Sequence, residues 1–532
     1  MTAGTATRYE SQTVERQQSF RLLLHAEWTK FRTVRGWVIT MVVAILATVA
    51  VGLLGSDATC STSVSGSGGG SAACPAFPTG PGGEAVQDAF YFAHQPLTGN
   101  GAITVQMTSL AGQVLGDHSD NGQIFSMKPG LQAWSKAGII IKESTSQGSA
   151  YAAMMVTGAH GVRMQWDYLN DTPGLTGSVS SSSPRWLRLV RTGDTITGYD
   201  SADGTNWTRA GTALLPGLTS TVQAGLFAAS PSHLKTIGSG IGNGSYVGVS
   251  TRATGVFDHV TLSHGTLSPG GGTWTGTDVG GFDQNGVPLP GAFRQSAGTF
   301  TVTGSGDIAP ETASGHVSLE HALIGSFAGL IALIVVGAMF ITAEYRRGMI
   351  RVSLTASPRR GRLLAAKAVV LGAVSFVTGL IAAGATIAVG ERTLSVGGSP
   401  VMPIPEPTVV RMIVGTAAML AVAAVLALAI ATILRRSAAS IATVIVVIFI
   451  PYLLAIVPNL LPAGAEDWLL RITPAAAFSL QQAFPQYSQV TANYLPVFGY
   501  FPLAPWAGFA VECAWAAAAL VLAGFLLRRR DA

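Results

Sequence analysis

The sequence predicts a polytopic α-helical membrane protein with six transmembrane helices and an all-β sandwich inserted after the first of them. Three observations predict this fold class: long uncharged apolar runs near both ends, a polar Gly/Ser/Thr-rich segment after the first run, and basic residues beside the runs. Charged residues make up only 11% of the 532 residues, whereas soluble domains average about 25%. We therefore expect the apolar runs to lie in lipid and the polar segment in water.

Charge divides the chain in the same way. Residues 56–320 hold 17 Asp/Glu and 11 Lys/Arg, a net charge of −6, and the rest holds 21 Lys/Arg and 10 Asp/Glu, a net charge of +11. The excess cations flank the apolar runs, where cations attract anionic lipid headgroups. This distribution favours membrane lipids as partners and argues against a nucleic-acid partner.

The first apolar run covers residues 37–55 and contains no charged residue. Its 19 residues, at 1.5 Å per residue, can cross a bilayer core of about 30 Å. Lys30, Arg32 and Arg35 precede the run, so segment 1–36 is expected to be cytoplasmic. A cleaved signal peptide is the competing interpretation, but the long run, the 36 preceding residues and the lack of a clear cleavage site favour an uncleaved anchor.

An amphipathic helix is expected just before this run. Large apolar residues recur there at helical spacing, with cations on the other faces. Such a helix lies in the membrane interface, with aromatic side chains at headgroup depth and cations toward phosphate. A short solvated helix is the alternative. The residues assigned to the interface helix are Phe20, Leu24, Trp28, Lys30, Phe31 and Arg32.

Residues 321–532 contain five further apolar runs. With the N-terminus inside, the basic loop 344–366, the pair Arg435-Arg436 and the terminal arginines 528–530 all fall on the cytoplasmic side, as the positive-inside rule requires. Both termini are therefore expected in the cytoplasm and the polar segment outside it. The five runs cover residues 321–343, 367–390, 409–433, 438–458 and 504–527.

Cys60 and Cys74 lie in a Ser/Gly-rich stretch, 56–84, that has the composition of a linker. Outside the cytosol these thiols could close a disulfide worth about 3 kcal/mol in the loop-entropy model. Free thiols are the alternative. Cys513 lies in an apolar run and is expected to be inert packing.

Residues 85–265 are predicted to form a β-sandwich. Short segments rich in β-branched and apolar residues, such as 102–107, 186–191 and 224–228, are separated by turn residues. Residues 266–320 are expected to be a linker that could add extra strands.

Four stretches of this segment resemble the concanavalin-like, laminin-G-type jelly-roll modules of bacterial surface proteins: KAGIIIKES (136–144), WLRLVRTGDTITGYDSADGTNWT (186–208), AGLFAAS (224–230) and FDHVTL (257–262). The resemblance implies an extracytoplasmic jelly roll that binds glycans by stacking sugars on tryptophan. Aromatic residues of a sandwich more often belong to its core, and this alternative stays open for each. The candidate glycan contacts are Trp134, Trp166, Trp186 and Trp207.

The membrane portion resembles ABC-2-type ABC transporter permeases of actinobacteria. The resemblance is carried by LLHAEWTKFRTVRGW (23–37), TAEYRRGMIRVSLTASPRRGRLLAAKAVVLG (342–372), AVLALAIATILRRSAASIA (424–442) and ITPAAAFSLQQAFP (472–485). It implies a channel of two permease subunits, either two copies or a copy and a homologue, driven by a separate cytosolic ATPase. The large insertion after the first run departs from the usual short connection of this family.

The same resemblance implies that the loop after the second run docks on the ATPase through a short coupling helix, here Tyr345–Leu354, ended by Ser357-Pro358. Its arginines would face an acidic partner, and Glu344 is placed to pair with Arg347. A plain positive-inside signal is the alternative, with Glu344 and Lys367 extending to the interface. The residues assigned to ATPase coupling are Glu344, Tyr345, Arg346, Arg347, Gly348, Met349, Arg351, Pro358, Arg359 and Arg360.

Motifs for catalysis are missing from the sequence. It has no Gly-x-x-x-x-Gly-Lys-Ser/Thr phosphate loop, no Gly-x-Ser-x-Gly, no His-Glu-x-x-His and no Cys-x-x-Cys, and its nine His show no metal-ligand spacing. We therefore expect no catalytic residue, metal or cofactor in this chain. ATP and Mg²⁺ would bind to the partner ATPase.

The leading hypothesis is thus a permease subunit of an exporter with an extracytoplasmic recognition domain. A membrane-anchored glycan receptor or signal transducer would use the same sandwich without an ATPase. A surface glycosidase would need two carboxylates about 5–10 Å apart, and the sequence cannot place Glu143, Asp194 and Asp203 together.

Overall fold

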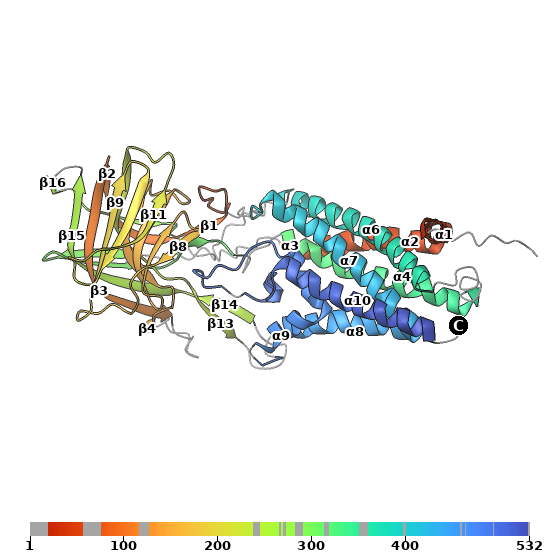
Figure 1. Ribbon diagram of the computed structural model, residues 1–532. Helices are drawn as coiled ribbons and strands as arrows, with labels where there is room; N and C mark the ends of the chain where they lie inside the picture. Colours follow the sequence, from red (N-terminus) through yellow and green to blue (C-terminus); the bar gives the residue numbers. More distant parts are fainter. Residues whose placement is uncertain are drawn as a thin grey trace, which may run out of the picture.

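The computed structural model of the chain consists of a β-sandwich and a bundle of helices that lie end to end (Figure 1). Both predicted parts of the fold are thereby confirmed. The structure describes residues 20–56, 76–115, 127–237, 245–264, 268–269, 273–281, 291–312, 319–349, 360–396, 401–457, 460–462, 464–492 and 494–529.

Six helices among the described residues are long and apolar enough to cross a membrane, as predicted. They are α2, the stretch from α3 to α4, and α6, α7, α8 and α10. Shorter helices flank or connect them. The helices are α1 (Phe20–Thr33), α2 (Arg35–Ser56), α3 (Leu319–Ala322), η1 (Leu323–Gly325), α4 (Ser326–Arg346), α6 (Arg360–Val396), α7 (Glu406–Leu434), α8 (Ser437–Ile456), α9 (Ala465–Ile472), η2 (Pro474–Gln481), η3 (Pro496–Phe498) and α10 (Pro505–Arg529).

Helices α4 and α7 form the centre of the bundle, whereas α2, α8 and α10 expose most of their length. Small residues let the two central helices approach closely. A Cβ at Gly337 of α4 would lie 2.4 Å from the Ala424 carbonyl oxygen of α7. The neighbouring Ala423 and Ala427 of α7 are fully buried in the same cluster.

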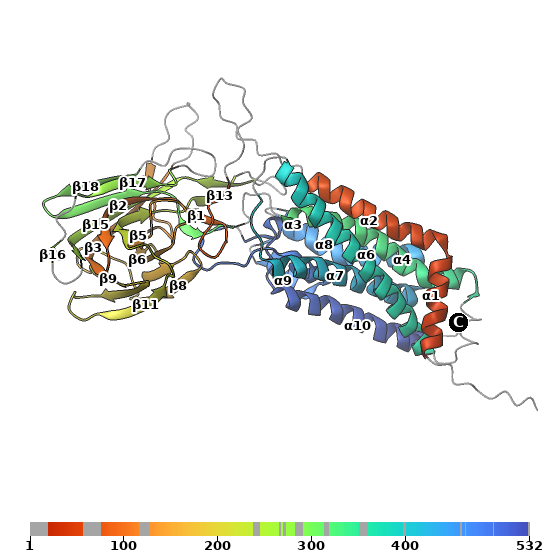
Figure 2. The same cartoon turned by 90° about the horizontal axis from the view of Figure 1, so that it is seen from above.

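Helix α1 lies across one end of the bundle and turns into α2 at Val34 (Figure 2). Glu27 and Phe31 face the bundle, whereas Phe20 and Trp28 are exposed. A helix forms at the expected position, but Phe31 and Leu24, which were expected at the membrane interface, pack against the core of the bundle. We call this end of the bundle the α1 end and the opposite one the sandwich end.

The sandwich consists of two large antiparallel sheets. Its nine-stranded sheet has the order β11-β10-β9-β3-β15-β19-β18, with β4 on β3 and β16 on β15, and its seven-stranded sheet has the order β17-β2-β12-β5-β6-β7-β8. The first contains β3 (Gly101–Leu115), β4 (Met127–Pro129), β9 (Arg185–Thr192), β10 (Thr195–Ser201), β11 (Thr208–Leu214), β15 (Thr251–His264), β16 (Ser268–Pro269), β18 (Ala292–Ser296) and β19 (Thr299–Gly304). The second contains β2 (Phe90–Thr98), β5 (Lys136–Lys142), β6 (Tyr151–Thr157), β7 (Val162–Trp166), β8 (Asn170–Pro173), β12 (Thr221–Ala229) and β17 (Thr275–Val279).

Two short ribbons complete the sandwich: β1 (Val86–Asp88) with β20 (Ile308–Pro310), and β13 (His233–Ile237) with β14 (Ser245–Val249). The segment 266–320, expected to be a linker that could add strands, contributes β16, β17, β18 and β19 to the large sheets.

The inner faces of the two sheets form the main core. In β9, Leu187 and Leu189 are buried between the sheets, and Arg188 lies on the outer face, as alternation in a strand requires. Strand β5 is buried along its whole length because the ribbon β1–β20 covers the outer face of its sheet, where Val86 and Ile308 pack against Ile140. On the outer face of the nine-stranded sheet, the described side chains of β9 and β10 are partly exposed instead.

Candidate functional site

Four charged side chains from three helices meet at the α1 end. The Lys367 ammonium of α6 donates to Glu27 Oε2 of α1 and to Glu344 Oε1 of α4, each at 2.7 Å. Lys30 Nζ lies 2.8 Å from Glu27 Oε1 and 3.2 Å from Glu344 Oε1. We call Glu27, Lys30, Glu344 and Lys367 the α1 ionic cluster.

The α1 ionic cluster is almost completely enclosed. The Lys367 side chain is fully buried and the two carboxylates are nearly so, whereas 40% of the Lys30 side chain is exposed. A buried charge is tolerated only when it is paired and hydrogen-bonded. Two cations and two anions balance here, and the Lys367 ammonium also lies 4.6 Å from the Phe340 ring centre.

The cluster brackets the basic loop predicted to couple to an ATPase. Glu344 lies just before the loop and Lys367 just after it, so their ion pair joins the two helices that the loop connects. Glu27 adds α1 to the same pair. A force applied to the loop would therefore reach three helices together.

The loop itself is described only in part. Arg346, Arg347, Gly348 and Met349 are exposed at the end of α4, and α4 ends at Arg346 with a turn at Gly348 (φ +66°). Arg351, Pro358 and Arg359 lie outside the described residues, as does the second half of the predicted helix Tyr345–Leu354.

Two contacts hold the borders of the loop against the neighbouring helices. The guanidinium of Arg435, beyond the end of α7, lies 5.2 Å from the ring centre of Tyr345. Arg360 Nη1 donates to the Leu527 carbonyl oxygen near the end of α10, at 2.7 Å. The loop, the α7–α8 connection and the end of α10 therefore meet at the α1 end.

The expectations for Glu344 and Lys367 need correction. Glu344 pairs with Lys30 and Lys367 instead of Arg347, and Lys367 is fully buried and does not extend to the interface. The role of Glu27 was missed altogether. Glu344 and Lys367 border apolar runs, but Glu27 borders none, and no spacing pairs residues 340 positions apart.

The four candidate tryptophans of the sandwich do not form one site. Trp134 is 7% exposed and stacks on His160 at 4.1 Å between ring centres. Trp166 packs against the core between the sheets. These two are in the environments that the core alternative predicted.

Trp186 and Trp207 share the outer face of the nine-stranded sheet. Arg188 lies two residues from Trp186 on β9, and its guanidinium is 3.9 Å from the Trp207 ring centre. Arg188 Nε also donates to Thr104 Oγ1 at 3.0 Å. Trp186 is covered by the turn at Gly204, where a Cβ would lie 2.7 Å from the indole. We call Trp186, Arg188 and Trp207 the tryptophan face.

The acids considered for a glycosidase lie apart. Asp194 and Asp203 are at opposite ends of β10, a strand of seven residues, which separates them by roughly 20 Å at about 3.3 Å per residue. Asp203 is held in its own turn, where the backbone N–H groups of Thr205 and Asn206 donate to it and keep the pKa of its carboxyl well below the usual range. Glu143 follows β5 in the other sheet.

Comparison with known protein families identifies the chain. The profile of a family described as "ABC-2 family transporter protein" matches residues 23–532. The chain belongs to this ABC-2 transporter family. None of the curated proteins matches the chain.

Solved structures with some likeness match only part of this ABC-2 protein. Scytalido-glutamic peptidase with a transition-state analog inhibitor has 11% identity and a TM-score of 0.27, over 41% of this chain and 98% of the peptidase. SCP-B, a member of the Eqolisin family of peptidases, has 9% identity and a TM-score of 0.24, over 41% and 98%. A functionally unknown protein from Saccharomyces cerevisiae has 13% identity and a TM-score of 0.21, over 37% and 85%.

Membership of the ABC-2 family makes the helix bundle a transport component in a membrane. The α1 ionic cluster and the basic loop both lie within the matched residues, as does the inserted sandwich. The sandwich is thus an insertion into an ABC-2 permease, between α2 and α3.

Proposed function

We propose that this chain is the permease subunit of an ABC exporter, driven by a separate cytosolic ATPase that docks on the loop between α4 and α6. The observation that carries the proposal is the ion pair between Glu344 and Lys367 across the base of this loop. Because Glu27 joins the pair, docking on the loop would move α1, α4 and α6 as one unit. Exposed Arg346 and Arg347 offer charge to an acidic partner.

The proposed orientation places the α1 end in the cytoplasm. Three basic segments meet there: the loop after Tyr345, the α7–α8 connection at Arg435, and the end of α10 near Leu527. Basic residues mark the cytoplasmic side of membrane proteins. The sandwich would then be extracytoplasmic and both termini cytoplasmic.

The remaining partners follow from this assignment. ATP and Mg²⁺ would bind to the ATPase, and a second permease copy or a homologue would complete the passage. Exposed apolar side chains of α2, α8 and α10, such as Leu46, Val446 and Val521, would face lipid or that second subunit.

For the sandwich we propose recognition of a glycan on the tryptophan face. Stacking on an aromatic ring combined with an adjacent guanidinium suits a sugar with acidic or hydroxyl groups. On the other outer face, the ribbon β1–β20 packs over the centre of the sheet around Ile140. A membrane-anchored receptor without transport is the competing proposal for the whole chain.

Reversal of charge on the loop tests the ATPase docking. The double variant Arg346→Glu/Arg347→Glu should lose copurification with the ATPase at least tenfold, because two attractive contacts become repulsive. Arg528→Glu/Arg529→Glu is a matched control with the same charge change at the same end. Unchanged association of the loop variant with the ATPase would reject docking on this loop. Loss of ATP-dependent export after removal of the ATPase would reject the competing proposal of a receptor without transport.

A binding assay on the full-length protein tests the tryptophan face. Trp207→Ala should abolish retention on the peptidoglycan or polysaccharide that binds the unaltered protein, whereas Trp468→Ala should not. Trp468 is a suitable control because it is 64% exposed and lies on the helix bundle. If the unaltered protein binds none of these glycans, the result would favour contact of the sandwich with another protein.

A further inference from the structure

The chain enters and leaves the sandwich through one small ribbon. β1 and β20 pair antiparallel, with Val86 opposite Pro310 and Asp88 opposite Ile308. β1 follows the segment that leads from α2, and β20 leads to α3. All covalent connection between sandwich and bundle therefore passes through this ribbon.

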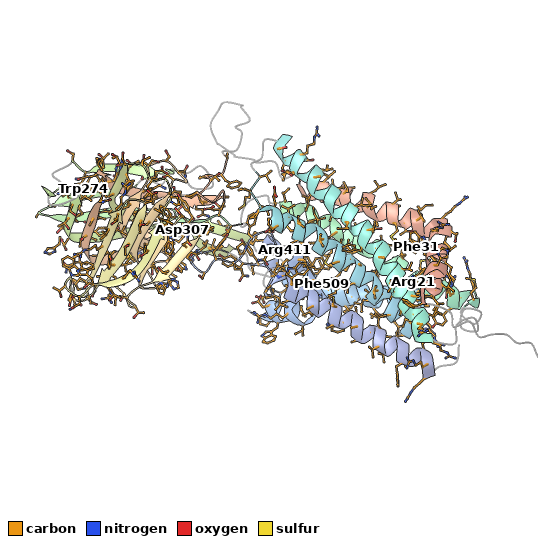
Figure 3. All side chains as sticks on the ribbon, turned by 45° about the horizontal axis from the view of Figure 1, so that its top comes forward. Arg21, Phe31, Trp274, Asp307, Arg411 and Phe509 are labelled. Carbon is orange, nitrogen blue, oxygen red and sulfur yellow. The ribbon has the colours of Figure 1, made fainter. Side chains whose placement is uncertain are left out.

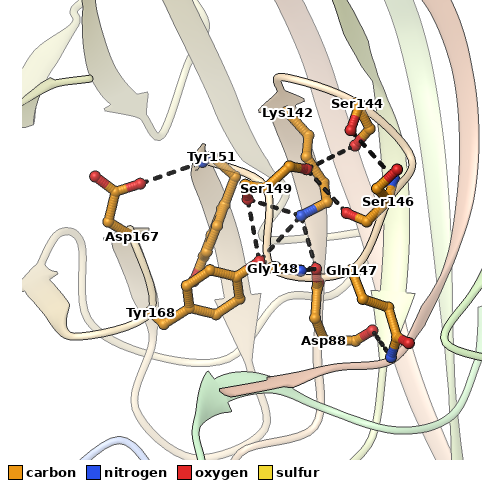
Figure 4. Close-up of polar contacts among 10 residues, drawn as sticks. All are labelled: Asp88, Lys142, Ser144, Ser146, Gln147, Gly148, Ser149, Tyr151, Asp167 and Tyr168. Carbon is orange, nitrogen blue, oxygen red and sulfur yellow. Dashed lines mark hydrogen bonds and ion pairs between the residues drawn. The ribbon is translucent and has the colours of Figure 1, made fainter. Parts of the chain in front are cut away.

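A buried ion pair holds β1 on the seven-stranded sheet. Asp88 Oδ2 accepts hydrogen bonds from Lys142 Nζ at 2.7 Å, Tyr168 Oη at 2.7 Å and the Gly148 N–H at 2.8 Å (Figure 4). Lys142 also donates to the Ser149 carbonyl oxygen at 2.9 Å. Neither charged side chain of the pair is exposed.

A second buried ion pair holds β20. Lys136 Nζ lies 2.5 Å from Asp307 Oδ1 and donates to the Ile308 carbonyl oxygen at 3.1 Å. Asp307 also accepts, on its backbone oxygen, the Ala89 N–H at 2.8 Å. Lys136 and Lys142 stand at the two ends of β5 and point to the same face, so one strand of the sheet holds both strands of the ribbon.

The other side of the ribbon is packed into the helix bundle. Ala85 belongs to a buried cluster with Leu323 of η1 and Tyr500, whereas the next residue, Val86, belongs to the sandwich cluster. Figure 3 shows Asp307 on the sandwich side of this junction and Arg411 on the facing end of the bundle. The core of the helix bundle and the core of the sandwich thus meet at two consecutive residues, Ala85 and Val86.

A separate segment crosses the junction as well. Gln489, in the connection between η2 and α10, donates from Nε2 to the Leu169 carbonyl oxygen at 3.2 Å. Leu169 follows Tyr168, which itself donates to Asp88. This contact links the ribbon anchor to the bundle by a second route.

We propose that the ribbon β1–β20, fixed by Asp88–Lys142 and Asp307–Lys136, is a rigid joint that makes the sandwich move as one body with the sandwich end of the bundle. Rearrangement of the helices during transport then reorients the sandwich, and a ligand held by the sandwich resists or favours that rearrangement. The joint does not depend on the proposed ATPase.

Spin labels can measure the joint in the full-length protein in lipid nanodiscs. Labels replace Thr192 on the sandwich and Val497 on the bundle, both exposed, in a background with the three native cysteines changed to serine. Dilution with unlabelled chain removes distances between copies. The expected result for the otherwise unaltered protein is one narrow distance distribution.

Loss of the ion pairs should release the sandwich. Lys136→Met and Lys142→Met should each broaden the distribution and raise hydrogen exchange of the β1 and β20 amides at least tenfold, because each leaves a buried carboxylate unpaired. Lys128→Met is the matched control, since Lys128 is exposed on β4. The double variant Lys136→Met/Asp307→Asn removes both charges of one pair and keeps the sheet interior intact.

Two outcomes would overturn the rigid joint. A broad distribution in the unaltered protein would do so without any variant, and so would variants whose distribution equals that of Lys128→Met. Slow exchange of the β6 amides in every variant verifies that the sandwich stays folded. Neither measurement involves ATPase association, so the joint and the proposed function can fail separately.

Discussion

Buried lysines form ion pairs in two regions, at the α1 end of the helix bundle and in the sandwich beside the ribbon β1–β20, but they are used differently. At the α1 end one ammonium, Lys367, is shared by two carboxylates, and the partly exposed Lys30 contacts the same two. In the sandwich, Lys136 and Lys142 of β5 each have a carboxylate of their own and a backbone carbonyl as a further acceptor.

The difference indicates different mechanical roles. Shared partners can be redistributed without leaving a charge unpaired, so the cluster can keep α1, α4 and α6 together while they are displaced as one unit. A lysine and a carboxylate that pair only with each other cannot separate without leaving a buried charge unpaired. The α1 ionic cluster therefore suits a region that moves, and the ion pairs of the ribbon β1–β20 suit a fixed joint.

The largest effect is expected where a lysine has an exclusive partner. Lys142→Met should destabilise the sandwich by about 3–5 kcal/mol, because Asp88 stays buried without a cation. Chemical denaturation followed by tryptophan fluorescence measures the change. Lys128→Met serves as the exposed control, and equal stability of the two variants would contradict the assignment of an exclusive pair.

A smaller loss is expected where partners are shared. Lys367→Met should cost about 2 kcal/mol, below the usual range for a broken buried pair, because Lys30 remains beside both carboxylates. Thermal denaturation in detergent and a double-mutant cycle with Glu344→Gln measure it. A strictly additive double variant would show that Glu344 and Lys367 do not interact.

The junction also predicts a dependence on pH. Burial, with a contribution from Glu84, raises the pKa of Asp167 to about 6. A raised carboxyl pKa gives stability that is present below the unfolded value near 4 and is lost as pH rises through about 6. The partly exposed side chain should therefore contribute about 1 kcal/mol more at pH 4 than at pH 7.

Asp167→Asn is the control for this effect. Denaturation of the full-length protein at both pH values should show the difference in the unaltered chain and lose it in the variant. An unchanged dependence would assign the titration to another group of the junction.

The smallest effect concerns the exposed member of the α1 ionic cluster. Lys30→Met should cost about 0.5 kcal/mol, because 40% of its side chain is exposed and solvent screens the pairs. The same thermal denaturation measures it against Lys367→Met. A loss of stability as large as that of Lys367→Met would show that the exposed Lys30 and the buried Lys367 contribute equally.

The sequence allowed prediction of the features that depend on local pattern. Uncharged runs located the six membrane helices, and alternating strands located the sandwich. The pairs Glu27–Lys367 and Asp88–Lys142 could not be predicted, because 340 and 54 positions separate their members and no periodicity reports such contacts. The sequence also could not separate the buried Trp134 from the outward Trp207, since each stands two residues before a basic residue, Lys136 and Arg209.

The narrow entrance to the sandwich has a consequence for how such a protein arises. The Glu311 N–H donates to the Ala85 carbonyl oxygen at 2.9 Å, so the borders of the insertion already touch. Residues 86–310 can therefore be excised and the ends joined by one or two glycines without stretching the backbone. A gene encoding a permease without the sandwich could therefore gain or lose the whole domain in a single insertion or deletion.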